Sequence, residues 1–363
     1  KHLYSQVEIA AVNEYFQVEV RNFPQPQPAS GQIVIEMKVT GLCGSDLHTV
    51  SGDRQTPCPT ILGHEIIGRV AELPAGAVND IEGLPLAVGD RITWSIAASC
   101  GACFFCDIDL PQKCLSLLKY GHEPISDAYG LSGGLAEYCR LSRGTAIVRV
   151  PESIPDRVGV VANCATATVA AALRAAGDLQ GCCVLIYGAG MLGCTAAAMA
   201  RTAGAREVIA VDVDNRRLET ASRFGATRTA SAGPVVSEVV ADETDGRGAD
   251  VVLELSGASS AAADGLEQLR IGGQLILVGA VSPSESVALN PEMVVRRLLT
   301  IRGLHNYAPS DLRRAVEFLE SAQRDWPLAE LVETEFGLEA VNEAFDHAIR
   351  QRSFRVAVRP GPA

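Results

Sequence analysis

The sequence predicts an α/β protein in which a doubly wound parallel sheet is joined to a β-rich domain. Up to about Val158 the chain shows short β-branched segments. An Ala-rich helical stretch begins there, and apolar strands then alternate with helical segments. A chain of 363 residues exceeds the size of one comfortable hydrophobic core. We therefore expect two domains, one of residues 1–160 with 305–363 and one of residues 161–304.

The first domain is predicted to be β-rich and barrel-like. Alternating and β-branched residues predict strands at 32–39 and 66–71. The tail, 315–358, predicts helices and one closing strand that return to this domain.

The second domain is predicted to hold a parallel sheet of six strands. Each apolar run is short, rich in Val, Ile and Leu, and followed by a helical stretch, as buried parallel strands are. The predicted strands are 184–187, 208–211, 251–255, 275–278 and 299–301, with a sixth near Arg228.

A glycine-rich turn follows the first of these strands. Gly188, Gly190 and Gly193 form G-x-G-x-x-G, with Met191 and Leu192 opening a helix predicted to run to about residue 203. This context is that of the Rossmann dinucleotide-binding turn, in which a helix N-terminus faces the pyrophosphate. The alternative is a Rossmann-like fold without coenzyme.

An acidic residue ends the next strand. Asp212 stands nineteen positions after Gly193, where a carboxylate binds an adenosine ribose and repels a 2′-phosphate. This favours NAD over NADP. Arg216 and Arg217 leave the preference open, because an arginine can hold the extra phosphate.

Four cysteines at C-x2-C-x2-C-x7-C spacing predict a metal site in the first domain. They are Cys100, Cys103, Cys106 and Cys114. Four thiolates around one tetrahedral ion are typical of structural zinc, and such a closed site has no open position for catalysis. The alternative is four unrelated buried cysteines.

A second set of metal-ligand residues is spread along the chain. Cys43, His64 and Cys164 together offer the two-Cys, one-His set of an open zinc site. Only the fold can join residues so far apart. Taken singly, His64 and Cys164 are equally explained as core packing.

These motifs, in this order, resemble the zinc-dependent alcohol dehydrogenases of the medium-chain dehydrogenase/reductase superfamily over nearly the whole chain. The motifs are GLCGSDLH from Gly41, GHE from Gly63, the four-cysteine lobe, Cys164 and GAGMLG from Gly188. The resemblance implies a GroES-like catalytic domain, a Rossmann domain, and hydride transfer between an alcohol and NAD. It implies a catalytic zinc on Cys43, His64 and Cys164, a structural zinc on the four-cysteine lobe, and a proton relay through Ser45 and His48.

The resemblance also assigns residues around the metal and the coenzyme. Glu65 is expected behind the zinc, either supporting the ligands or replacing one of them, since polyol dehydrogenases use this glutamate as a direct ligand. Asp46 is expected to hold the outer ring nitrogen of His64, and an N-cap or a surface salt bridge is the alternative for both acids. Thr168 falls where the family contacts nicotinamide, and Arg355 where it contacts pyrophosphate; packing or surface roles remain the alternatives.

The substrate is not determined by these motifs. The stretch 113–123 resembles zinc dehydrogenases found alongside phosphonate catabolism genes, which implies an anionic alcohol or aldehyde served by Lys119, His122 and Arg302. A solvated basic face is the alternative. A polyol or amino-alcohol substrate, a zinc-free reductase and an inactive zinc-binding scaffold are the competing hypotheses.

Composition limits the classes of molecule that the protein is expected to bind. The net charge of −12 and a pI near 5.1 argue against nucleic acid or an anionic membrane as partner. Eleven cysteines, an odd number, and no recognisable signal peptide favour a reducing compartment, so we expect a soluble cytoplasmic protein. The family resemblance implies a homodimer or homotetramer, with the strand at 299–303 as a candidate edge.

Overall fold

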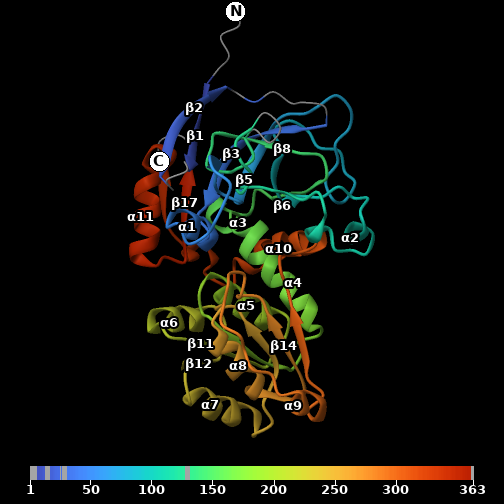
Figure 1. Cartoon of the computed structure of the whole chain (residues 1–363), viewed down its shortest axis with the longest axis vertical. Helices are drawn as coiled ribbons and strands as arrows, with labels where there is room; N and C mark the ends of the chain where they lie inside the picture. The colour runs from blue at the N-terminus through green and yellow to red at the C-terminus, as the bar shows by residue number, and fades with distance from the viewer. Residues whose placement is uncertain (1–5, 13–16, 25, 27–30, 127–130, 361–363) are drawn as a thin grey trace, which may run out of the picture. The chain divides into compact units, whose positions relative to one another are not determined.

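The computed structural model describes residues 6–12, 17–24, 26, 31–126 and 131–360 (Figure 1). The chain divides into two compact units. The first holds 1–164, 308–323 and 328–363, and the second holds 165–307 and 324–327.

An eight-stranded sheet forms the centre of the first unit. Its main order is β16-β17-β3-β5-β6-β7, with β8 paired to β3 and β9 to β6; β2, β1 and β4 form a smaller sheet. The predicted strands at 32–39 and 66–71 are confirmed as β3 and β5, which run antiparallel. The bounds are β1 Gln6–Val12, β2 Val18–Pro24, β3 Ile33–Gly41, β4 Thr60–Ile61, β5 Glu65–Glu72, β6 Arg91–Ala98, β7 Leu118–Lys119, β8 Tyr138–Leu141, β9 Thr145–Arg149, β16 Val332–Gly337 and β17 Arg355–Arg359.

The helices of this unit are short except near the end of the chain. Two apolar clusters form its core, one around Trp94 and Met37 and one around Leu62 and Phe345. The helices are α1 Gly44–Val50, α2 Phe104–Asp107, α3 Asp156–Gly159, α10 Pro309–Ala322 and α11 Val341–Gln351.

The tail returns to the first unit, as predicted, but the expectation of one closing strand was wrong. β16 and β17 pair in parallel, α11 lies between them in the chain, and β17 pairs with β3. β16 was missed because its sequence, VETEFG, carries two glutamates in six residues and its four central residues are only partly buried.

The second unit contains the predicted six-stranded sheet. All neighbouring strands are parallel, in the order β12-β11-β10-β13-β14-β15, so the doubly wound arrangement is confirmed. Strand order reverses between β10 and β13, where ligands of such sheets bind. The strands are β10 Cys183–Tyr187, β11 Glu207–Asp212, β12 Arg228–Ser231, β13 Ala249–Glu254, β14 Leu269–Leu277 and β15 Thr300–Gly303.

Helices connect these strands. α5 begins at Met191, directly after the glycine-rich turn, and ends at Thr202. The helices are α4 Ala167–Ala176, α5 Met191–Thr202, α6 Asn215–Arg223, α7 Val235–Thr244, α8 Ser259–Gln268 and α9 Pro291–Arg296.

Among the described residues, one helical segment, Asp156–Ala176, is long and apolar enough to cross a membrane by length and composition. Most of it is buried inside the protein, and a buried core helix passes the same test. Its middle turn, Ala162–Thr166, is π-helical. Such turns often mark functional sites, and this one carries Cys164.

Candidate functional site

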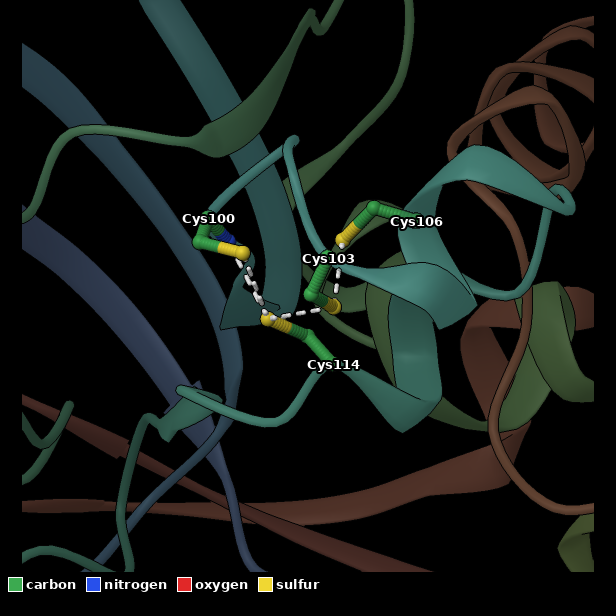
Figure 2. Close-up of side chains that lie close together, drawn as sticks. All are labelled: Cys100, Cys103, Cys106 and Cys114. Atoms are coloured by element: carbon green, nitrogen blue, oxygen red, sulfur yellow. Dashed lines mark hydrogen bonds between the residues drawn. The ribbon is translucent and has the colours of Figure 1, made fainter.

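The four cysteines of the first unit form one cluster. Figure 2 shows the sulfurs turned toward one another, with Sγ–Sγ distances of 3.6 Å for Cys103–Cys106, 3.9 Å for Cys103–Cys114 and 3.4 Å for Cys100–Cys114. A zinc–sulfur bond of about 2.3 Å gives a tetrahedron with edges of about 3.8 Å. The four donors therefore fit a tetrahedral zinc.

Backbone N–H groups prepare this cluster for a cation. The N–H groups of Cys100 and Ser116 donate to Cys114 Sγ at 3.2 and 3.4 Å. Backbone hydrogen bonds from Leu115 and Cys106 lower the pKa of Cys103 to about 6. Thiolate is the form that binds metal, so the local backbone favours loading.

The fold also joins the second set of metal-ligand residues. The donor atoms of Cys43, His64 and Cys164 all lie within 4.8 Å of one another. Cys43 caps the start of α1, His64 precedes β5, and Cys164 lies on the π-helical turn. Two thiolates and one imidazole are zinc ligands, and three protein donors leave a fourth position for substrate or water.

Asp46 and Ser45 approach the two ring nitrogens of His64. Asp46 Oδ1 lies 3.4 Å from Nδ1, an ion-pair distance too long for a good hydrogen bond. The same buried carboxylate accepts the N–H groups of Cys43 and Gly63. Ser45 Oγ lies 3.5 Å from Nε2, the nitrogen left for a metal. One carboxylate thus fixes the segments that carry two of the three ligands.

Charge within the cluster is unevenly shared. A hydrogen bond from Cys164, together with Arg355 and His64, holds the pKa of Cys43 well below its usual value, while the pKa of Cys164 is raised. Burial alone would lower the pKa of His64, but Asp46 and Cys43 raise it to about 10. A divalent cation would replace these protons, since metal ligands bind deprotonated.

Glu65 and Arg355 form a buried ion pair beside Cys43. Arg355 Nε donates to Glu65 Oε2 at 2.7 Å and Nη2 donates to Oε1 at 2.9 Å, while Nη2 also lies 3.6 Å from Cys43 Sγ. Both side chains are at least nine-tenths buried. Both carboxylate oxygens of Glu65 are therefore engaged by the guanidinium, and the predicted coenzyme contact of Arg355 stays a prediction.

Asn163 organises the site and was missed as a functional residue. Its side chain accepts from the N–H of Ile66 and donates to the carbonyls of His64 and Trp94, at 3.0, 2.7 and 2.9 Å. It thus ties the neighbour of Cys164 to β5 and β6. Its position directly before Cys164 was the available signal.

His48, the predicted relay residue, is exposed on α1. Its Nδ1 lies 3.6 Å from Asp53 Oδ2. Ser45 and His48 share a short helix, and their relay remains a prediction.

The glycine-rich turn of the second unit packs against its surroundings too closely for a side chain at Gly188 or Gly193. Gly188 has φ +94°, and a side chain there would meet the backbone of Ser256 at 2.9 Å. A Cβ on Gly193 would meet the carbonyl oxygen of Gly188 at 1.9 Å, so α5 packs tightly on the turn. Gly190, Met191 and Leu192 lie at the start of α5.

Two of the remaining candidate coenzyme residues of this unit, Asp212 and Arg217, lie at the turn. Asp212 accepts the N–H of Ala189 at 2.7 Å and that of Asp214 at 2.9 Å, so it braces the turn while each oxygen keeps a lone pair. An Arg217 nitrogen lies 3.8 Å from the Cβ position of Gly190. Thr168 lies half-buried on α4.

Comparison with known proteins identifies both parts of the chain. Residues 29–152 match the alcohol dehydrogenase GroES-like domain, and residues 192–321 match the zinc-binding dehydrogenase model. A sorbitol dehydrogenase of Halalkalibacterium halodurans is 30% identical over 94% of this chain and 95% of its own length.

Solved structures agree over almost the full length. An alcohol dehydrogenase of Thermotoga maritima superposes with a TM-score of 0.93 at 29% identity, covering 98% of this chain and 100% of that one. A putative zinc-binding dehydrogenase of Sinorhizobium meliloti, bound to NADP, gives 0.85 at 25% identity and the same coverage. The chain belongs to the zinc-dependent alcohol dehydrogenase family of the medium-chain dehydrogenase/reductase superfamily.

Proposed function

We propose that the protein is a zinc-dependent oxidoreductase that interconverts an alcohol and an aldehyde or ketone by hydride transfer to or from NAD. The observation that carries this proposal is the convergence of Cys43, His64 and Cys164 within 4.8 Å, with two thiols and one imidazole as donors. The first unit would hold substrate and both zinc ions, and the second would hold the coenzyme.

Zinc in this cluster would supply Lewis acidity, which makes an alcohol proton easier to remove. Ser45 Oγ, 3.5 Å from His64 Nε2, is placed to accept that proton. The exposed imidazole of His48 would release it to water, because histidine changes charge near neutral pH. Asp46 holds the Cys43 and Gly63 segments, and so fixes the ligand geometry.

We propose that Glu65 supports the metal site without ligating zinc. Both of its oxygens are held by Arg355, at 2.7 and 2.9 Å, and Cys164 already serves as the third protein ligand. This favours the alcohol dehydrogenase ligand set over that of polyol dehydrogenases. Metal analysis tests it: Cys164→Ala should lose one zinc per chain, whereas Glu65→Gln should keep both.

We propose NAD as the coenzyme, bound at the Gly188–Gly193 turn. Asp212 ends β11, where a carboxylate opposes a 2′-phosphate. The nearby guanidinium of Arg217 would serve the adenosine ribose or a phosphate. The ratio of kcat/KM for NAD to that for NADP measures the preference, and a ratio below one would overturn it.

The central experiment is NADH formation with primary, secondary, polyol and phosphonate-bearing alcohols, with and without a zinc chelator. Chelator-sensitive turnover of one group is the expected result. Protein that binds zinc and NAD but turns over none of them would favour the inactive scaffold. Turnover by metal-free protein would favour a zinc-free reductase.

We further propose a homo-oligomer that works in the cytoplasm. β15 ends the six-stranded sheet, and its residues are exposed, as are Leu298 and Val295 nearby. A second copy pairing at this edge would cover them. None of the eleven cysteines forms a disulfide, as expected in a reducing compartment. Light scattering after size exclusion tests the assembly, and a monomer at micromolar concentration would overturn it.

A further inference from the structure

Strands β5 and β6 stop pairing where β5 approaches the metal-ligand cluster. The last residues of the two strands in register are Gly68 and Ile92. In the same register Ile66 would face Trp94 as the next pair joined by backbone hydrogen bonds. That pair does not form in the described structure, and the two strands separate there. Buried backbone groups need partners, so something else must bond the facing edges of the two strands.

The side chain of Asn163 occupies this gap. Its Oδ1 accepts the N–H of Ile66 at 3.0 Å, and its Nδ2 donates to the carbonyl of Trp94 at 2.9 Å. A side-chain amide offers the same donor and acceptor as a backbone peptide group. The fully buried Asn163 therefore replaces the missing hydrogen bonds between the two strands.

The same amide also holds the backbone of His64. Nδ2 donates to the carbonyl of His64 at 2.7 Å, and Cys164 directly follows Asn163 in the π-helical turn. Before His64 in the chain, Asp46 accepts the N–H of Gly63 at 3.2 Å. The backbone around His64 is thus held on one side by Asp46 and on the other by the residue that precedes Cys164.

We propose that Asn163 is a positioning residue for the catalytic metal, which sets the turn of Cys164 against the backbone of His64. This rests on the proposed function, since both residues are zinc ligands in it. Hydrogen bonds that orient metal ligands typically change metal affinity by about 10–100-fold. Asn163 acts here through the backbone of one ligand and through its chain connection to the other.

The gap between the strands also offers a matched control. Thr93 Oγ1 donates to the carbonyl of Ile66 at 2.8 Å, so it too links β6 to β5 beside the cluster. In the described part of the chain its hydroxyl bonds to no residue of the turn that carries Cys164. Thr93→Val removes this link and keeps the shape of the side chain.

Zinc affinity tests the proposal without substrate or turnover. Wild-type, Asn163→Leu, Asn163→Ser and Thr93→Val proteins are equilibrated in a series of zinc buffers, and the zinc bound per chain is measured. Leucine approximates the shape of asparagine but makes none of its hydrogen bonds, whereas serine keeps a hydroxyl and leaves space for water. Cys164→Ala, in which the four-cysteine cluster is intact, shows which affinity belongs to that cluster.

We expect Asn163→Leu to weaken zinc binding at one site by about 10–100-fold and Asn163→Ser to weaken it by a smaller factor. The four-cysteine site should stay within about twofold in every variant, and so should both sites in Thr93→Val. If the leucine variant does not fold, the serine variant decides. Affinity within twofold of wild type in the folded Asn163 variants would overturn the proposal. Equal weakening at both zinc sites, or by Thr93→Val, would do the same, because a general loss of structure would then explain the effect.

The visible absorption of bound cobalt gives a second measurement, because it reports the geometry of the ligands. The bands of the catalytic site should shift in Asn163→Ser and stay unchanged in Thr93→Val; identical spectra in all three proteins would count against the proposal.

Failure of the proposed function gives a different result. If Cys164→Ala binds two zinc ions as tightly as wild type, Cys164 is not a ligand and both proposals fall. If Cys164→Ala loses one ion while the Asn163 variants keep both at wild-type affinity, only the role of Asn163 falls.

Discussion

Removing Arg355 should destabilise the first unit strongly, because it leaves the Glu65 carboxylate buried and unpaired. The two side chains share two hydrogen bonds of 2.7 and 2.9 Å, and Glu65 is fully buried. Removing one partner of such a pair lowers the free energy of unfolding by about 3–5 kcal/mol, whereas replacing both partners by neutral groups lowers it far less. Arg355→Met should therefore lower the free energy of unfolding by about 3–5 kcal/mol, and adding Glu65→Gln should recover about half.

Two tryptophans make the measurement selective. Trp94 lies in the first unit and Trp326 in the second, so a Trp326→Phe background leaves fluorescence from the first unit alone. Urea unfolding of the zinc-loaded proteins then gives each free energy. The exposed pair Arg69–Glu152 is the control, and Arg69→Met should cost less than about 1 kcal/mol.

Two outcomes would refute this reasoning. The first is an Arg355→Met protein within about 1 kcal/mol of wild type, which would mean that the carboxylate is stabilised without the guanidinium. The second is a double variant as unstable as the single one, which would mean that packing of the arginine, and not its charge, matters. Zinc content should be measured throughout, because Arg355 also contacts Cys43.

Three further predictions concern the metal lobe, pH and the relay. Cys103→Ser should halve the zinc content from two ions to one per chain, and unchanged zinc would show that the four-cysteine cluster is not a metal site. Asp156 lies part-buried between Arg91 and Arg359, and after the opposing effect of burial these two arginines lower its pKa. Asp156→Asn should thus lower the free energy of unfolding by about 1–2 kcal/mol at neutral pH. This difference should disappear as the pH falls below about 4, because Asp156 then becomes protonated in both the folded and the unfolded state. Urea unfolding of both proteins at several pH values measures the difference. His48→Ala should slow turnover most at low pH, where external base is scarce, and a parallel loss at every pH would rule out the relay.

Much of the fold followed from sequence because its signals are local. The six parallel strands were placed close to their observed positions, since most of them are short apolar runs followed by a helix. β16 was not predicted because its alternation of Val, Thr and Phe with glutamates is short and only partly buried, and its pairing with β17 is decided by the fold. β14 begins at Leu269, six residues before the predicted start, through two glycines that weaken a strand signal.

The sequence by itself determined the sites that lie within one short segment. Each of these sites is joined by a short stretch of chain, so its spacing limits its geometry; the two sites are Cys100 to Cys114 and Gly188 to Gly193. Tertiary structure alone decided that Cys164 would meet Cys43 and His64, and that Arg355 would reach Glu65, 290 positions away. Neither contact leaves a periodic or spacing signal.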